Sequence, residues 1–221
     1  MSTSSPRIFL LSPANCAGLR ARMVMSERAS FPLAVRLRTR EGAPLGDLFS
    51  FMSGLYFRGK LAYARAFAAA PDRESDISGP GVFVITPTAG LRSPDTLVTI
   101  DALRAFALVD VAPGNPKYRR PLERSAKAIA ADIGADCEVV LLGSIASPKY
   151  VDVLQGIFGD RLVFPAAFVG RGDMSRGGLL LRCVSAAEEL AYVPVAGAVR
   201  HGARPARLDP ATRPKPIVRQ A

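Results

Sequence analysis

The most informative stretch of the sequence is residues 7–18, which read RIFLLSPANCAG. The apolar run Ile8 to Leu11 is shorter than an ordinary helix and is typical of a strand that is buried on both faces. The run ends at Ser12-Pro13, and the small polar residues after it are typical of a loop. We therefore expect a buried strand over Arg7 to Leu11 that leads directly into a polar loop.

Two later stretches repeat this organisation. Val82 to Ile85 is a second apolar run, and it ends at Thr86-Pro87. Glu138 to Leu142 is a third run, and it continues into Gly143-Ser144. Continuous apolar runs of this length are typical of parallel strands, because helices cover such strands on both faces. The three runs therefore predict the centre of a mainly parallel sheet.

The segments between the runs predict the helices that cover this sheet. A long helix is expected over residues 47–70, where Gly54 and Gly59 would bend or divide it. Pro113 to Arg120 is predicted as a loop, with Pro121 in the first turn of the next helix. Shorter helices are predicted at residues 17–25, 101–107 and 150–158, further apolar or extended runs at 97–100, 108–111 and 162–164, and the stretch 31–40 stays ambiguous. Strands that alternate with helices predict an α/β protein of the three-layer α/β/α, Rossmann-like class with a mainly parallel sheet.

Length and charge divide the chain into a folded part and a tail. With 221 residues, of which 49% are hydrophobic, the chain suits a single domain, predicted over residues 1–198. Residues 199–221 carry half of the net charge of +10, because they combine six basic residues with one acidic residue, Asp209. This Pro-rich segment is predicted to be a disordered basic tail, which either attracts a polyanion or serves only to keep the protein soluble.

The composition also narrows the classes of site and location. The N-terminal apolar run is too short for a signal peptide or a membrane span, so a cytoplasmic protein without membrane contact is expected. Cys16, Cys137 and Cys183 are far apart, and His201 is the single histidine. These residues favour neither a disulfide framework nor a zinc site, so no metal is predicted, and the sequence identifies no cofactor. A catalytic Ser–His or Cys–His pair is also disfavoured, because His201 lies in the predicted tail.

The loops after the three buried runs are the first candidate site. The carboxyl ends of parallel strands meet at one edge of a sheet, where ligands bind. Small residues let a ligand reach backbone N–H groups, and a following helix N-terminus favours an anion. Turns also use Ser, Pro and Gly, so each loop alone is more typical of a plain turn, and only the three loops together favour a site. The binding candidates in these loops are Ser12, Asn15, Thr86, Thr88, Gly143, Ser144, Lys149 and Tyr150.

Two further segments suggest contacts with a phosphate or a base. Residues 170–178 combine glycines with Arg171 and Arg176, the composition of a loop that closes over a phosphate. An exposed loop with an Arg–Asp pair has the same composition. In the long predicted helix, Tyr56, Lys60 and Tyr63 share one face, beside Arg58. Such a face can stack a base and hold its phosphate, and it is equally typical of a helix whose aromatic side chains cover a sheet.

Three residues are candidates for catalysis. Asp173 and Asp95 are the acid/base candidates, although nothing in their spacing pairs them. Cys16 follows the first strand, and a thiolate would be favoured there if the residue lies at a helix N-terminus. A cysteine without a histidine partner is more often a small packing residue.

The order of these features resembles a family of Rossmann-like domains of unknown function related to the bacterial peroxide-stress protein YaaA, and related domains occur in enzymes of tRNA base modification. The resemblance is carried by residues 9–13, 55–64, 84–91, 141–150 and 170–178. The loop Ala14-Asn15-Cys16 departs from the family, which has a lysine there. The resemblance implies a nucleotide or nucleic-acid context without a defined reaction.

The sequence therefore supports three functional hypotheses. The first is an enzyme that acts on a nucleotide or a nucleic-acid base, at the N-glycosidic bond, with Arg171 and Arg176 on the phosphate and Asp173 or Asp95 at the reacting sugar. The second is a non-catalytic DNA- or RNA-binding protein that uses the basic tail and the Tyr56/Lys60 face. The third is a partner-binding subunit of an operon-encoded system, in which the loops are only turns.

Overall fold

The computed structural model describes residues 5–146, 148–199, 202–203 and 205–206, and it confirms the expected α/β class. In this part of the chain the central sheet has the strand order β4-β3-β1-β6-β7-β8. Its strands are β1 (Arg7–Leu11), β3 (Val82–Thr86), β4 (Gly90–Arg92), β6 (Glu138–Leu142), β7 (Leu162–Pro165) and β8 (Tyr192–Pro194). The inner strands β3, β1, β6 and β7 are parallel, and the edge strands β4 and β8 are antiparallel to their neighbours.

The centre of the sheet is built from the three predicted apolar runs. Phe9 of β1 is paired with Val82 of β3 on one side and with Val140 of β6 on the other. All three residues are buried, as are the residues next to them along each strand. Both faces of these strands are covered, which explains why the runs are continuously apolar rather than alternating.

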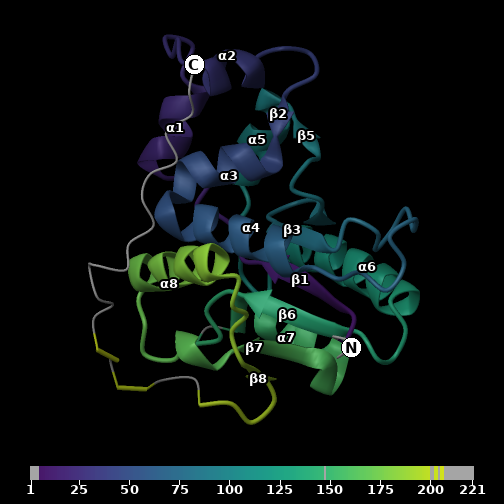
Figure 1. Ribbon diagram of the computed structural model, residues 1–221. Coiled ribbons are helices and arrows are strands. Elements are labelled where there is room, and N and C mark those ends of the chain that lie inside the picture. Colours follow the sequence, from purple (N-terminus) through teal and green to yellow (C-terminus); the bar gives the residue numbers. More distant parts are fainter. Residues whose placement is uncertain (1–4, 147, 200–201, 204, 207–221) are drawn as a thin grey trace.

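Two helical layers cover the sheet (Figure 1). Helices α4 (Leu55–Phe67) and α8 (Asp173–Ala186) pack against each other over one face, while α6 (Pro116–Asp132) and α7 (Pro148–Phe158) cover the other. Short 3-10 turns, η1 (Gly159–Arg161) and η2 (Ala166–Phe168), precede and follow β7. The arrangement is the three-layer α/β/α, Rossmann-like architecture that the sequence predicts.

A third group of elements lies together at one end of the molecule (Figure 1). It consists of α1 (Leu19–Met25), α2 (Pro32–Leu37), α3 (Leu45–Ser53), α5 (Ile100–Ala107) and a two-stranded sheet of β2 (Ala43–Pro44) and β5 (Leu97–Val98). The loop after β1 leads directly into α1, so this group stands beyond the carboxyl end of the central strand.

Helices α4 and α8 cross at two glycines. A side chain at Gly59 would place its Cβ 2.7 Å from the carbonyl oxygen of Gly177. A Cβ at Gly177 would lie 2.8 Å from the carbonyl oxygen of Leu55 and from the Cα of Tyr56. The two backbones therefore approach as closely as only glycine allows, which brings the first turn of α8 next to the start of α4.

Several predicted boundaries are wrong. The helix expected over residues 47–70 begins at Leu45 and ends at Phe67. It is divided into α3 and α4 at Gly54, one of the two glycines expected to bend or divide it, which has φ 64° and ψ −133°. Gly59 does not interrupt α4. The ambiguous stretch 31–40 contains the short helix α2, and the apolar run 108–111 is a loop.

The start of α6 is also corrected. The helix begins at Pro116 rather than near Pro121, because the side chain of Asn115 caps it by accepting a hydrogen bond from the backbone N–H of Lys117 at 3.1 Å. Pro121 lies inside the helix, and its carbonyl oxygen accepts a hydrogen bond from Ser125 Oγ. An Asn-Pro pair at the cap and first position is as good a start signal as the later proline.

The predicted tail is mostly outside the described residues, which beyond position 199 are only 202–203 and 205–206. Val195 is buried and Ala198 packs against the core. Beyond the predicted end of the domain at residue 198, Gly202 and Ala203 lie next to Val169 and Gly170, and the boundary stays a prediction. None of the described helices has both the length and the apolar character needed to cross a membrane.

Candidate functional site

A pocket opens where the connections of the sheet change direction. The chain leaves β1 toward β3 on one side, and it leaves β6 toward β7 on the other. The carboxyl ends of β1 and β6 therefore flank the point at which Rossmann-like proteins bind ligands. A pocket of about 810 Å³ lies there. Its lining comes from the two strand-end loops, the covering helices α4 and α8, and the group of elements beyond β1: residues 12–17 after β1; Ser144, Lys149 and Tyr150 after β6; Tyr56 and Lys60 of α4; Asp173 of α8; Ser53 of α3; Pro87; and residues 106–111.

The buried lysine Lys60 is the central feature of the pocket wall. It projects from α4 across the end of β1, and only 1% of its surface is exposed. Its ammonium Nζ donates to the carbonyl oxygen of Ser12 at 2.7 Å and to Ser12 Oγ at 2.8 Å. The rings of Tyr56 and Phe57 lie 4.5 and 4.8 Å from the same nitrogen. A lysine that the sequence placed on an aromatic helix face is thus tied to the serine at the end of the first strand.

Burial governs the ionisation of Lys60. Loss of hydration lowers the pKa of Lys60 to about 7, with Asp173 raising it and Arg176 lowering it. No described carboxylate forms an ion pair with Lys60; the recorded pair on α8 joins Asp173 to Arg176 at 3.8 Å. The amine can therefore exchange a proton near neutral pH, which an ordinary surface lysine does not do.

The loop after β6 closes the back of the pocket. The hydroxyl of Tyr150 donates to the carbonyl oxygen of Ser144 at 3.0 Å. Burial raises the pKa of Tyr150, and hydrogen bonds to Ser12 and Ser144 oppose this change. A Cβ at Gly143 would lie 2.7 Å from the Tyr150 hydroxyl oxygen and 2.9 Å from Ser12 Cβ. Glycine at position 143 is thus what allows Ser12 and Tyr150 to meet.

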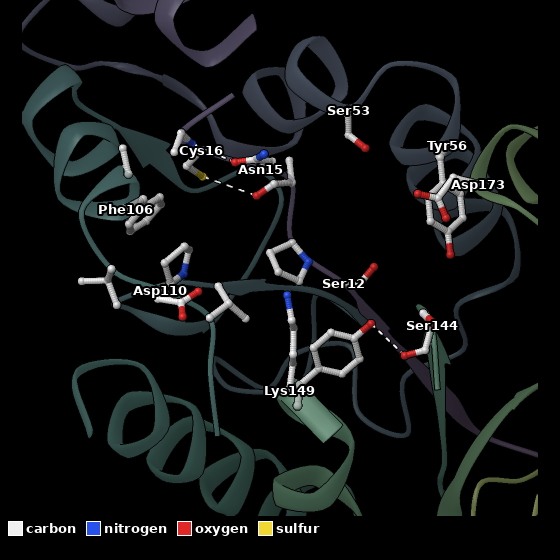
Figure 2. A pocket seen from close by; sticks show the side chains of 18 of the residues that line it. Ser12, Asn15, Cys16, Ser53, Tyr56, Phe106, Asp110, Ser144, Lys149 and Asp173 are labelled. Carbon is white, nitrogen blue, oxygen red and sulfur yellow. Dashed lines mark hydrogen bonds between the residues drawn. The ribbon is translucent and has the colours of Figure 1, made fainter. Parts of the chain in front are cut away.

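Positive charge also enters the pocket from α7. Lys149 is the second residue of this helix, and Figure 2 shows its side chain reaching toward the centre of the pocket. The N-terminus of the eleven-residue α7 lies at the same edge, directly after the β6 loop. Both the ammonium group and the helix dipole favour an anion there.

The Gly-rich segment 170–178 is mostly helix rather than a closing loop, since α8 begins at Asp173. Asp173 lines the pocket with an exposed side chain (Figure 2). The two arginines instead hold the chain that precedes the helix. Arg171 Nε donates to the carbonyl oxygen of Ala167, and Arg176 donates twice to that of Phe168, at 3.2 and 3.0 Å. Both guanidinium groups thus already donate to backbone carbonyl oxygens, and their predicted role in phosphate binding stays a prediction. The role of Asp173 at a glycosidic bond also stays a prediction.

Cys16 lines the pocket but does not meet the condition for a thiolate. It is buried, and α1 begins only at Leu19, so the residue is not at a helix N-terminus. Its thiol points to the carbonyl oxygen of Ala14 at 3.6 Å, and burial raises the pKa of Cys16 to about 12. Burial and the raised pKa of Cys16 favour the alternative of a small packing residue, and a catalytic role for Cys16 stays a prediction.

Four predicted site residues lie elsewhere. Asp95 is exposed and accepts a hydrogen bond from Arg65 at 2.6 Å. Thr86 is fully buried and serves its own turn, donating to the carbonyl oxygen of Gly90. Thr88 does not line the pocket, and Arg58 is exposed on α4. The second strand-end loop therefore contributes only Pro87 to the site.

Sequence reasoning missed one wall of the pocket. Residues 106–111, at the end of α5 and beyond it, bring in the ring of Phe106 and the carboxylate of Asp110. Figure 2 shows Asp110 and Asp173 on opposite sides of the pocket. Ser53 was missed as well. Nothing in the spacing of these residues signals a site; only the position of the α5 group beyond β1 brings them there.

Among the described residues, no group of three or more His, Cys, Asp and Glu side chains is arranged to hold a metal ion. The fold and the pocket define a Rossmann-like α/β protein with a polar pocket at the switch point of its sheet. Comparison with protein-family models, with curated proteins and with solved structures finds no match for the chain.

Proposed function

We propose that the protein is an enzyme that acts on a nucleotide bound in the pocket between the carboxyl ends of β1 and β6. The observation that carries the proposal is the pocket itself: about 810 Å³ at the switch point, with Lys149 and the N-terminus of α7 at one end. This volume lies within the range of small-molecule sites, and the position is the one where this fold class binds phosphorylated ligands.

The rest of the lining suits the two parts of a nucleotide. Phe106, Pro13 and Pro87 line the pocket and offer apolar surface for a base. Figure 2 shows Phe106 on the side of the pocket away from Ser144. Asp110 and Asp173 provide acceptors for ribose hydroxyls or base N–H groups. A charged phosphate would then lie at Lys149, because hydrogen bonds between an ammonium group and a phosphate oxygen are stronger than those between neutral groups.

Binding of a nucleic-acid polymer through α4 is less well supported. Tyr56, Lys60 and Tyr63 share a face as predicted, but all three are buried. The ring of Tyr63 packs edge-on against Phe9 of β1, with centroids 5.9 Å apart, so it covers the sheet. This face cannot stack exposed bases, and no described contact favours a polymer over a small ligand.

Calorimetric titration tests the proposal. Nucleoside mono-, di- and triphosphates, the matching nucleosides and a short DNA are titrated into the full chain, followed by chromatography of each bound compound for turnover. We expect a nucleotide to bind more tightly than its nucleoside. Lys149→Met should weaken nucleotide binding by about tenfold or more, since one charge-assisted hydrogen bond contributes about 1.5–3 kcal/mol. Lys127→Met, which removes an exposed lysine on α6, is the matched control and should bind like the wild type.

Two outcomes would overturn the proposal. One is binding of no nucleotide, or equal loss in the Lys149 and Lys127 variants. The other is binding of DNA alone with a steep salt dependence, which is the signature of a polymer-binding protein.

A further inference from the structure

We propose that Ser12 is a nucleophile and Lys60 its general base, and that this pair transfers the acyl group of an ester or acyl phosphate in the pocket to water. The inference rests on the proposed function only for the anionic part of the substrate, which would lie at Lys149. The Ser12–Lys60 pair itself stands on separate observations.

The geometry is that of a base beside its hydroxyl. Lys60 Nζ lies 2.8 Å from Ser12 Oγ, within the distance over which a proton passes between heavy atoms. The second contact, to the carbonyl oxygen of Ser12 at 2.7 Å, fixes one N–H of the amine and leaves its lone pair for the hydroxyl. Ser12 stands directly after a paired strand and lines the pocket with 7% of its surface exposed, so its oxygen is held in place at the pocket wall. A serine with a lysine base is a known variant of the serine nucleophile.

The surroundings keep the amine able to accept a proton. Lys60 is desolvated beneath the rings of Tyr56 and Phe57, and no described carboxylate pairs with it. The charged groups that act on it come from α8, where Asp173 and Arg176 have opposite effects. Burial lowers the pKa of Lys60 to about 7, so much of the amine is neutral at neutral pH. A purely structural lysine would gain more from a buried counter-ion.

The reaction balances without a further reagent. As Ser12 Oγ bonds to the acyl carbon, its proton passes to Lys60 Nζ. The bond from the acyl carbon to the leaving oxygen then breaks, and that oxygen takes the proton from the Lys60 ammonium. Water attacks the acyl-serine with Lys60 again as base, releasing the acid and restoring Ser12. The hydroxyl of Tyr150 lies beside Ser12 across Gly143, and its proton is donated to the carbonyl oxygen of Ser144.

Labelling by a fluorophosphonate tests the pair without knowledge of the substrate. The reagent forms a bond between phosphorus and an activated serine oxygen and releases fluoride, and intact-mass and peptide analysis locate the label. We expect one label, on Ser12, with a rate that rises about tenfold from pH 6 to pH 8.5 as the amine loses its proton. Ser12→Ala should abolish labelling, and Lys60→Met should slow it by about a hundredfold or more.

The controls are an exposed serine and an exposed lysine outside the pocket. Ser185→Ala on α8 and Lys127→Met on α6 should be labelled at the wild-type rate. Circular dichroism establishes that each variant is folded. If Lys60→Met does not fold, the pH profile of the wild type decides, because it requires no variant.

The proposal is overturned by label on another residue, by no label, or by a wild-type rate that does not change between pH 6 and pH 8.5. Equal rates for folded Lys60→Met and wild type would overturn the role of Lys60. Labelling of Ser12 in a protein that binds no nucleotide would keep the pair and overturn only the nucleotide proposal. Nucleotide binding without labelling would do the reverse.

Discussion

Replacing Lys60 by methionine should change how the stability of the protein depends on pH. Methionine has a similar length and no charge, so Lys60→Met keeps the packing against Tyr56 and Phe57 and removes the buried amine. The variant therefore isolates what the ionisation of one side chain contributes to folding.

The size of the effect follows from the pKa values of Lys60 in the two states. In the unfolded chain a lysine has a pKa of about 10.4, whereas burial lowers the pKa of Lys60 to about 7 in the folded protein. Below pH 7 the amine is protonated in both states, so the penalty of burying the charge is fully present. Between pH 7 and 10 the unfolded state binds more protons, so stability rises with pH by about 1.4 kcal/mol per unit. From pH 6 to pH 9 the gain from Lys60 is about 3 kcal/mol.

Urea unfolding at pH 6 and pH 9 measures this gain, followed by far-ultraviolet circular dichroism because the chain has no tryptophan. Other groups titrate in both proteins, so the relevant quantity is the difference between wild type and variant. That difference should shift by about 3 kcal/mol in favour of the wild type as the pH rises. Lys127→Met should follow the wild type at both values. Parallel behaviour of wild type and Lys60→Met would refute the lowered pKa and, with it, the neutral amine.

Three further results are expected. Gly177→Ala should lower the free energy of unfolding by about 1–3 kcal/mol in urea titrations, because its Cβ would meet Tyr56 Cα at 2.8 Å; wild-type stability would contradict the close helix crossing. Gly156→Ala should instead add about 0.5–1 kcal/mol, since this exposed glycine inside α7 has no atom within 4 Å of the new methyl group; a loss would mean that α7 is not formed there. Alkylation of Cys16 by iodoacetamide at pH 8 should be about a hundredfold or more slower in the folded than in the urea-unfolded protein, because burial raises the pKa of its thiol to about 12; equal rates, followed by peptide mass analysis, would show a reactive thiolate.

The centre of the fold could be predicted because its signals are local. Strands β1, β3 and β6 are covered on both faces, so each contains a short, uninterrupted apolar run. The runs are followed by Ser12-Pro13, Thr86-Pro87 and Gly143. The alternation of such runs with helical segments then requires a mainly parallel sheet. The loops after β1 and β6 could be identified in the same way, since the polar residues stand directly after the runs.

Errors arose where a local signal had two meanings. Pro121 and Pro116 both suit the start of a helix, and the cap at Asn115 selects the earlier one. The glycines of residues 170–178 suggest a flexible loop, but Gly177 is needed where α8 crosses α4. Thr86 begins a segment whose composition is typical of a ligand-binding loop, but its hydroxyl donates a hydrogen bond to the carbonyl oxygen of Gly90 within the turn.

The sequence by itself therefore determined the α/β class, the buried strands and two of the loops at the candidate site. Only the tertiary structure decided that Lys60 and Ser12, 48 residues apart, form a pair, and that Asp110 and Phe106 complete the pocket wall. The physical reason is range. A buried strand can be recognised from its own residues, because burial on both faces requires them to be apolar. The proximity of Lys60 to Ser12 instead depends on how α4 packs across β1 and against Gly177 of α8. The lowered pKa of Lys60 follows from that burial, so it cannot be predicted from the residues next to Lys60 in the sequence.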